Sequence, residues 1–219
     1  PAENRSLQSK KERAKGGYSI FNLEEIKLIY TSDFLKKAKD DDENYYWTLI
    51  LGLITGCRIS EITSLKSSQF KIFDEKINFI QIEDSKTKAG IREIPVPEML
   101  FKLGLANFIK GKEQIFKYKL RLGKGSGNAV GKKFKRHLEE LKIERDKLVF
   151  HSIRKFLNNY LMKNEGLAIE PRCQLLGHEL DNVNVKVYSK DFSIEEMAKL
   201  VNPAQMKILT MIGLIKSKF

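Results

Sequence analysis

One region of the C-terminal third concentrates side chains that suit chemistry on a charged substrate. It contains two of the chain's three histidines, His151 and His178, together with Arg154 and Tyr188. Without a metal ion, a catalyst that attacks a phosphodiester must neutralise its negative oxygens with fixed donors, and planar bidentate arginines suit this best. Tyrosine, whose ordinary pKa is about 10, forms a phosphoester that is stable yet reversible. We therefore interpret Arg58 and Arg154 as candidate phosphate ligands and Tyr188 as a candidate nucleophile, with a lysine or histidine as the acid.

Five short motifs follow one another along the chain, from Thr55 to Lys190. They read TGCRISEI, DSKTKAGIREIPV, HSIRK, LLGH and VYSK. Each is weak alone, but in this order they resemble the first arginine box, the hairpin with the catalytic lysine, the His-x-x-Arg box, the third-box histidine and the nucleophile of the tyrosine recombinase (phage integrase) family. The resemblance covers nearly all of the folded part of the chain. It implies the catalytic fold of that family and DNA cleavage without metal, ATP or other cofactor.

The resemblance implies a role for each matched position. Arg58 and Arg154 would grip the scissile phosphate, and His151 would assist in phosphate contact and proton transfer. His178 would donate a hydrogen bond to a non-bridging oxygen. Tyr188 would form a 3′-phosphotyrosyl bond and release a 5′-hydroxyl, and a 5′-hydroxyl from a partner strand can reverse this step.

The acid and a supporting residue also come from these motifs. Lys86, on the hairpin turn, would protonate the 5′-oxygen leaving group, and Lys88, two residues along the same turn, is the alternative. Glu61 follows Arg58 by three residues and so lies on the same helical face. The resemblance implies that Glu61 orients a site residue rather than reacting.

Each of these residues also has an ordinary structural interpretation. The chain has seven tyrosines, and most tyrosines are half-buried packing residues. Arg58 could cap carbonyls near the end of a buried helix, His151 could begin a helix, and His178 could belong to a turn after Gly177. His137 has no motif around it, and we interpret it as an exposed helix position.

The chain is strongly basic, with a formal net charge of +12. Between Lys110 and Arg136, ten lysines and arginines accompany a single acid, Glu113. This density favours double-stranded DNA as a partner, whereas the plain alternative is a solvated helix face next to a loop. The candidate DNA-binding residues are Lys124, Lys132, Lys133, Lys135 and Arg136.

The remaining composition predicts one folded domain. Cys57 and Cys173 stand far apart without a CxxC motif or a histidine at ligand spacing, which argues against a disulfide framework or a metal site. No apolar run of about 18 residues and no signal-peptide core occurs, which predicts a soluble cytoplasmic protein without a membrane segment. We expect a basic linker or arm at 1–17 and the catalytic domain at 18–219. We also expect the N-terminal core-binding domain that most members of the resembling family carry to be absent from this chain.

The elements that must position these residues are mainly helical. A capping-box pattern at Asn22 predicts a helix over 22–39, and the apolar stretch 44–56 predicts a buried helix that ends at Gly56. β-branched and aromatic alternation from Gln69 to Val96 predicts a small antiparallel sheet of about three strands. Further helices are expected at 98–110, 127–142, 151–164, 193–201 and 204–215, with Asn202-Pro203 ending the fourth of these. The predicted class is α+β, mainly α.

These patterns favour a site-specific DNA recombinase, an integrase of a phage, prophage or other mobile element. A chromosome-resolving recombinase or a relaxing topoisomerase would use the same chemistry. The alternatives of another class are a catalytically silent DNA-binding accessory protein and, more remotely, a helical RNA-binding protein. The resemblance implies a homotetramer on DNA, formed from chains that can be monomeric when isolated. The apolar tail after Phe192 would dock on its own subunit or on a neighbour, and we expect its deletion to leave single-subunit folding largely intact.

Overall fold

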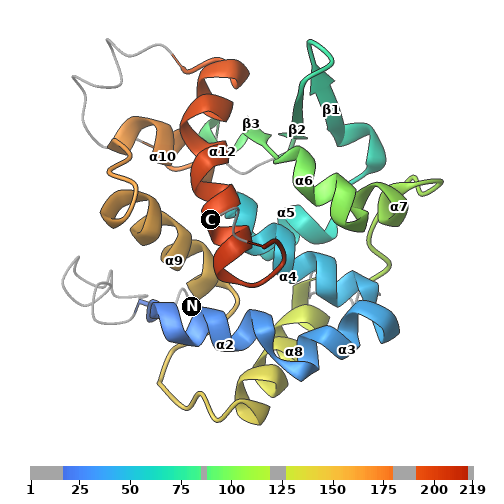
Figure 1. The fold of residues 1–219 in the computed structure, drawn as a ribbon, viewed down its shortest axis with the longest axis vertical. Helices are drawn as coiled ribbons and strands as arrows, with labels where there is room; N and C mark the ends of the chain where they lie inside the picture. Colours follow the sequence, from blue (N-terminus) through green and yellow to red (C-terminus); the bar gives the residue numbers. More distant parts are fainter. Residues whose placement is uncertain (1–16, 85–87, 119–126, 180–190, 217–219) are drawn as a thin grey trace, which may run out of the picture.

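The computed structural model describes residues 17–84, 88–118, 127–179 and 191–216. They form a mainly helical domain with one small sheet, which confirms the predicted class. Helix α12 runs through the middle of the molecule, with α9 and α10 on one side and the sheet on the other (Figure 1). Among these residues, no helix combines the length and the apolar character that crossing a lipid bilayer requires.

The N-terminal region folds as two helices where the sequence predicts one. α2 (Leu23–Thr31) begins with the predicted capping box. Glu25 N donates to Asn22 Oδ1 and Asn22 N donates to Glu25 Oε2, at a distance of 2.8 Å in both cases. Ser32 then turns to an extended backbone, and its hydroxyl accepts from Leu35 N at 3.2 Å to cap α3 (Asp33–Asp41). A serine hydroxyl competes with the helical backbone for hydrogen bonds, and this explains the break.

Helix α4 (Glu43–Thr55) lies at the centre of the core. Every residue from Tyr45 to Thr55 is buried, as the apolar stretch predicts. Gly56 ends the helix with a φ of 64° in the left-handed region, as also predicted. The short helix α5 (Ile59–Thr63) begins three residues later, so Arg58 is held between two helices.

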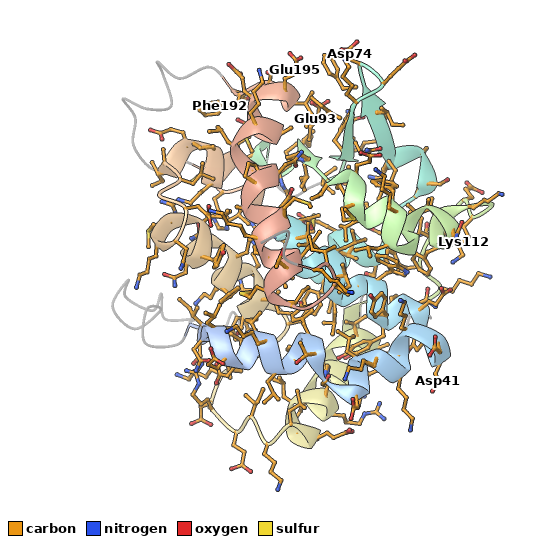
Figure 2. All side chains as sticks on the ribbon, in the orientation of Figure 1. Asp41, Asp74, Glu93, Lys112, Phe192 and Glu195 are labelled. Atoms are coloured by element: carbon orange, nitrogen blue, oxygen red, sulfur yellow. The ribbon has the colours of Figure 1, made fainter. Side chains whose placement is uncertain are left out.

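The sheet is antiparallel and three-stranded, as predicted, and its strand order is β1-β2-β3. In the central strand, Ile80 pairs with Phe70 on one side and with Ile94 on the other. Asp74 lies at the tip of the first hairpin (Figure 2). The elements of this region are η1 (Ser67–Gln69), β1 (Phe70–Phe73), β2 (Ile77–Ile82), η2 (Lys88–Gly90) and β3 (Arg92–Pro95).

The helices after the sheet follow the predicted ranges with two differences. One is α10 (Ile169–Leu176), which was not predicted, because Pro171 and the mixed polarity of this short segment hide its helical period. The predicted helix 98–110 is divided into three segments, because Gly104 has a non-helical φ of 118°. The elements are α6 (Glu98–Leu100), the π-helical η3 (Phe101–Leu105), α7 (Ala106–Ile109), α8 (Gly127–Glu140), α9 (His151–Lys163) and α10 (Ile169–Leu176).

The interpretation of His137 as an exposed residue is wrong. It is 0% exposed and lies on the buried face of α8 with Phe134. Its Nε2 is 2.8 Å from Ser32 Oγ and its Nδ1 is 3.0 Å from Tyr45 Oη, while the Phe34 ring stacks on it at 4.3 Å. Its spacing from Phe134 places it on the apolar stripe of the helix, where both ring nitrogens find partners.

The tail forms one helix, α12 (Ile194–Met211), so the predicted end at Asn202-Pro203 is wrong. The helix packs against β2, β3 and α10 of its own chain. Gln205 Nε2 donates to the carbonyls of Ile54 at 3.0 Å and Pro95 at 2.9 Å. An interior proline disfavours a helix by about 3 kcal/mol, which the buried apolar face on both sides of it offsets. That face comprises Met197, Val201, Ala204, Ile208 and Leu209.

Candidate active site

Arg58 stands at the N-terminus of α5, where its side chain is 38% exposed. Its backbone N–H donates to Glu61 Oε2 at 2.8 Å and its Nη1 donates to Glu61 Oε1 at 2.6 Å. Its Nη2 lies 3.4 Å from the carbonyl oxygen of Gly177 at the end of α10. Glu61 therefore holds the guanidinium and the backbone of Arg58 by two hydrogen bonds, while part of Arg58 stays open to solvent.

Glu61 also binds a second arginine that the sequence reasoning missed. Arg92 on β3 donates from Nη2 to Glu61 Oε2 at 3.0 Å and from Nη1 to Glu61 Oε1 at 3.3 Å. Burial alone would raise the pKa of Glu61, but the hydrogen bonds and charge of Arg92, with the bonds from Arg58, lower this pKa to about 2. The alternation of the strand could have indicated that Arg92 is buried, because Arg92 lies two residues before the core residue Ile94 and so on the same face.

Arg154, on the first turn of α9, is 3% exposed and points toward the ends of two other helices. Its Nη1 donates to the Gly56 carbonyl at 2.7 Å, and its Nη2 donates to the Leu176 carbonyl. Its buried Nε has no hydrogen-bond partner within the part of the chain that the structure describes. Burial, followed by repulsion from Arg92 and Arg58, lowers the pKa of Arg154 to about 10, so it remains a cation at neutral pH.

Both predicted histidines lie beside these arginines. His151 opens α9, and the ring of Tyr18 lies against it with centroids 5.9 Å apart. His178 follows the left-handed Gly177 that ends α10. Although His178 is exposed as a whole residue, partial desolvation and then repulsion from Arg154 and Arg58 lower its pKa to about 4. Burial and then Arg154 also lower the pKa of His151, so both imidazoles tend toward the neutral form.

Three predicted residues lie outside the described ranges, namely Lys86, Lys124 and Tyr188. The backbone of Lys88 begins η2, and its side chain is outside the description as well. Beyond the nucleophile position, Phe192 is joined to α10 by two hydrogen bonds with the side chain of Gln174, at 2.7 Å and 2.9 Å. Phe192 stands at the start of α12 (Figure 2).

A family model decides the classification of this chain. The model described as the phage integrase family matches residues 23–193. The chain belongs to the phage integrase family. No curated protein matches it.

Solved structures place this phage integrase family member in the same fold. A lambda integrase (75–356) dimer bound to a COC' core site is 21% identical with a TM-score of 0.56, over 87% of this chain and 65% of that one. The XerH recombinase on a palindromic difH substrate, in a post-cleavage complex, is 16% identical with a TM-score of 0.59, over 94% and 57%. The lambda integrase catalytic core is 22% identical with a TM-score of 0.52, over 74% and 96%. The chain thus spans less than two thirds of the first two.

The basic surface of this family member divides into two faces of α8. Lys132, Lys135 and Arg136 are exposed, whereas Lys133 turns inward to Asp42 at 2.7 Å. Lys133 Nζ also lies 4.8 Å from the centroid of the Tyr45 ring. The N-terminal end of α8 packs against α5, next to Arg58. The exposed cations therefore lie on a helix whose first turn contacts Ile59, the residue after Arg58.

The cluster as a whole suits an anionic substrate. Arg58 contacts the carbonyl of Gly177 and Arg154 donates to the carbonyl of Leu176, the two residues that precede His178. His151 lies one helical turn before Arg154 on α9. The predicted residues of the first, third and fourth motifs therefore lie together. In the described ranges, no group of three or more histidine, cysteine or acidic side chains is placed to hold a metal ion. Fixed guanidinium and imidazole donors can bind and polarise a phosphodiester directly.

Proposed function

We propose that residues 18–219 are the catalytic domain of a site-specific DNA recombinase, an integrase. The observation that carries this proposal is the convergence of Arg58, Arg154, His151 and His178 around the adjoining ends of α4, α9 and α10. Such a set supplies charge and hydrogen-bond donors to a phosphate that is bound from the open side of Arg58. Membership of the phage integrase family supports the same chemistry.

The reaction is a transesterification in which one phosphoester replaces another. The phenolic oxygen of Tyr188 attacks phosphorus, and His151 in its neutral form accepts the phenolic proton. The bond from phosphorus to the 5′-oxygen breaks, and Lys86, or Lys88 on the same turn, protonates this oxygen. The 3′-phosphotyrosyl bond then keeps the energy of the broken bond, so a 5′-hydroxyl from another strand can reverse the step without ATP.

The substrate is double-stranded DNA, held along α8. The solved lambda integrase relative is a dimer on its core site. Complete exchange between two duplexes requires four strand cleavages, and each chain offers one Tyr188. We therefore propose that the protein acts as a homotetramer on two paired sites. We also propose that it acts in the cytoplasm.

This function can be tested with a nicked DNA duplex that carries the attachment site of the mobile element. Cleavage next to the nick releases a short strand, so the protein should stay covalently attached to DNA on a denaturing gel, also in excess EDTA. Tyr188→Phe should bind duplex as the wild type does and form no adduct. A wild-type protein that binds the duplex without forming an adduct would instead be the catalytically silent accessory protein.

The same gel identifies the acid. We expect Lys86→Ala to slow adduct formation far more than Lys88→Ala. A 5′-bridging phosphorothiolate should restore the rate of the slow variant, because its sulfur leaves without protonation. If the phosphorothiolate restores the rate of adduct formation in Lys88→Ala and not in Lys86→Ala, the acid is Lys88.

A further inference from the structure

Arg92 is a buried cation that lies inside the arginine cluster but has no access to a substrate. Its side chain is 2% exposed. Its Nε donates to the Leu175 carbonyl at 2.8 Å and its Nη1 donates to the Gly90 carbonyl at 2.7 Å. The remaining bonds go to Glu61 at 3.0 Å and 3.3 Å and to Cys57 Sγ at 3.8 Å. A buried guanidinium with these partners holds them in one geometry, because its donors are fixed in a plane.

Three of the four partners of Arg92 belong to elements that lead to different reactive positions. Glu61 on α5 orients Arg58. Leu175 on α10 is followed within three residues by His178. Gly90 closes η2, at the end of the turn on which the sequence places the acid. Arg92 is therefore the side chain through which the hairpin, α5 and α10 are joined.

The packing around Arg92 is close on the side of Gly177. A Cβ placed on Gly177 would lie 2.8 Å from Arg92 Nη1 and 2.9 Å from the Ala89 carbonyl oxygen. The glycine at the end of α10 therefore lies directly against both the guanidinium and the hairpin backbone. A change in the shape of residue 92 must shift the hairpin relative to α10 or leave buried carbonyls without donors.

We propose that Arg92 is a positioning residue that holds the acid-bearing hairpin in register with the phosphate-binding cluster. This inference rests on the proposed recombinase function. It applies to Lys86 and Lys88 alike, since both lysines lie within four residues before Gly90 in the sequence. Arg92 acts through the hairpin and Glu61 and does not touch DNA. When Arg92 is changed, Arg58 keeps its own two hydrogen bonds to Glu61, whereas Gly90 loses the donor from Arg92. The change should therefore impair protonation of the leaving group more than phosphate binding.

Arg92→Lys distinguishes this positioning role from one in which Arg92 only neutralises the charge of Glu61. Lysine keeps the positive charge beside Glu61 but cannot reproduce the fork to Leu175 and Gly90. At saturating DNA we expect single-turnover cleavage of an ordinary nicked substrate to slow about 100-fold, as small misplacements of a catalytic group do. The 5′-bridging phosphorothiolate, which needs no acid, should be cleaved within about threefold of the wild-type rate.

Arg145→Lys is the matched control. Arg145 forms a similar fork, because its Nε and Nη2 donate to the capping-box carboxylate of Glu25 at 2.7 Å each, and Nη2 also donates to the Ile20 carbonyl at 2.8 Å. That fork joins α2 to the loop before α9. We expect Arg145→Lys to cleave both substrates at the wild-type rate.

The outcomes are distinct. Equal slowing of Arg92→Lys on both substrates, or no slowing on either, overturns the positioning role. A wild-type protein that cleaves neither substrate removes the proposed function and this inference with it. If Arg92→Lys lacks a cooperative melting transition, Arg92→Gln decides, because its side-chain amide can replace the bond to Leu175 but not the bond to Gly90. It should show the same selective recovery on the phosphorothiolate.

Discussion

Arg154 Nη1 donates to the carbonyl oxygen of Gly56 over 2.7 Å, which joins the predicted phosphate ligand on α9 to the last turn of α4. Gly56 has a φ of 64°, a conformation that L side chains rarely adopt. A Cβ there would lie 2.4 Å from Leu176 Cδ2 and 3.0 Å from Leu157 Cδ2. The position of Arg154 thus depends on a glycine that precedes it by almost a hundred residues.

Gly56→Ala should lower the free energy of unfolding by about 2–4 kcal/mol, the sum of left-handed strain and overpacking. It should also slow adduct formation, because the carbonyl that anchors Arg154 moves. Gly111→Ala is the matched control, since Gly111 has a φ of 72° with nothing within 4 Å of its added Cβ. Urea denaturation measures both variants. An equal loss of stability in the two would mean that the packing around Gly56 carries no energy.

Local patterns predicted the elements around this site well. The capping box at Asn22, the left-handed Gly56 and the three strands all depend on neighbours a few residues apart. The positions of Arg58 after the helix that ends at Gly56 and of His151 at the start of a helix followed from the same local patterns. Local order along the chain was therefore enough for these features, but it did not reveal α10, which ends just before His178.

Long-range contacts were not predictable in the same way. Arg92 pairs with Glu61 across 31 residues, and His137 bonds to Ser32 across 105. No local pattern specifies which distant partner satisfies a buried polar group. Pro203 shows the same limit, because burial of its helix against the sheet outweighs the local preference to stop.

His137 predicts a specific dependence of stability on pH. Burial, and then repulsion from Lys133, lowers its pKa to about 4, whereas an unfolded histidine has a pKa of about 6.5. The unfolded state therefore binds a proton first as pH falls, and stability is lost on acidification below about pH 6.5. Between pH 7.5 and pH 5 this residue should cost about 2 kcal/mol of unfolding free energy.

His137→Gln tests this dependence by urea denaturation at both pH values. The variant should be less stable at pH 7.5, because its amide fits the Ser32 and Tyr45 hydroxyls less well. Its further loss on going to pH 5 should be about 2 kcal/mol smaller than that of the wild type. His151 and His178 titrate in both proteins and so cancel in the comparison. Identical pH dependence would mean that His137 ionises normally in the folded state.

Substitutions on the two faces of α8 should affect DNA binding differently. Lys132 and Arg136 are exposed one helical turn apart, whereas Lys133 is paired with Asp42. Lys132→Ala with Arg136→Ala should weaken duplex binding and reduce the slope of log affinity against log salt by about 2. Lys133→Ala should leave this slope unchanged and lower the melting temperature. A slope that responds to Lys133→Ala alone would place the DNA on the other face of the helix.

The last prediction concerns α12, which packs on its own chain. Met197, Val201, Ile208 and Leu209 are 0% exposed in it. Burying four such side chains contributes about 6–12 kcal/mol, which is comparable to the whole stability of a domain. Deletion after Phe192 should therefore abolish the cooperative thermal transition rather than leave the fold intact. A persisting cooperative melt would show that the helix is dispensable for the core and free to bind a neighbouring subunit.

Two point variants make the same test without a truncation. Leu209→Ala removes a fully buried side chain and should cost about 2–5 kcal/mol, whereas Leu200, on the same helix, is 40% exposed. Leu200→Ala should therefore change the stability by no more than about 0.5 kcal/mol. If the two variants melt alike in the isolated chain, the buried face of α12 does not contribute to the fold of a single subunit. If Leu209→Ala alone lowers the melting temperature, the helix belongs to the core that holds Arg92 and β3 in place.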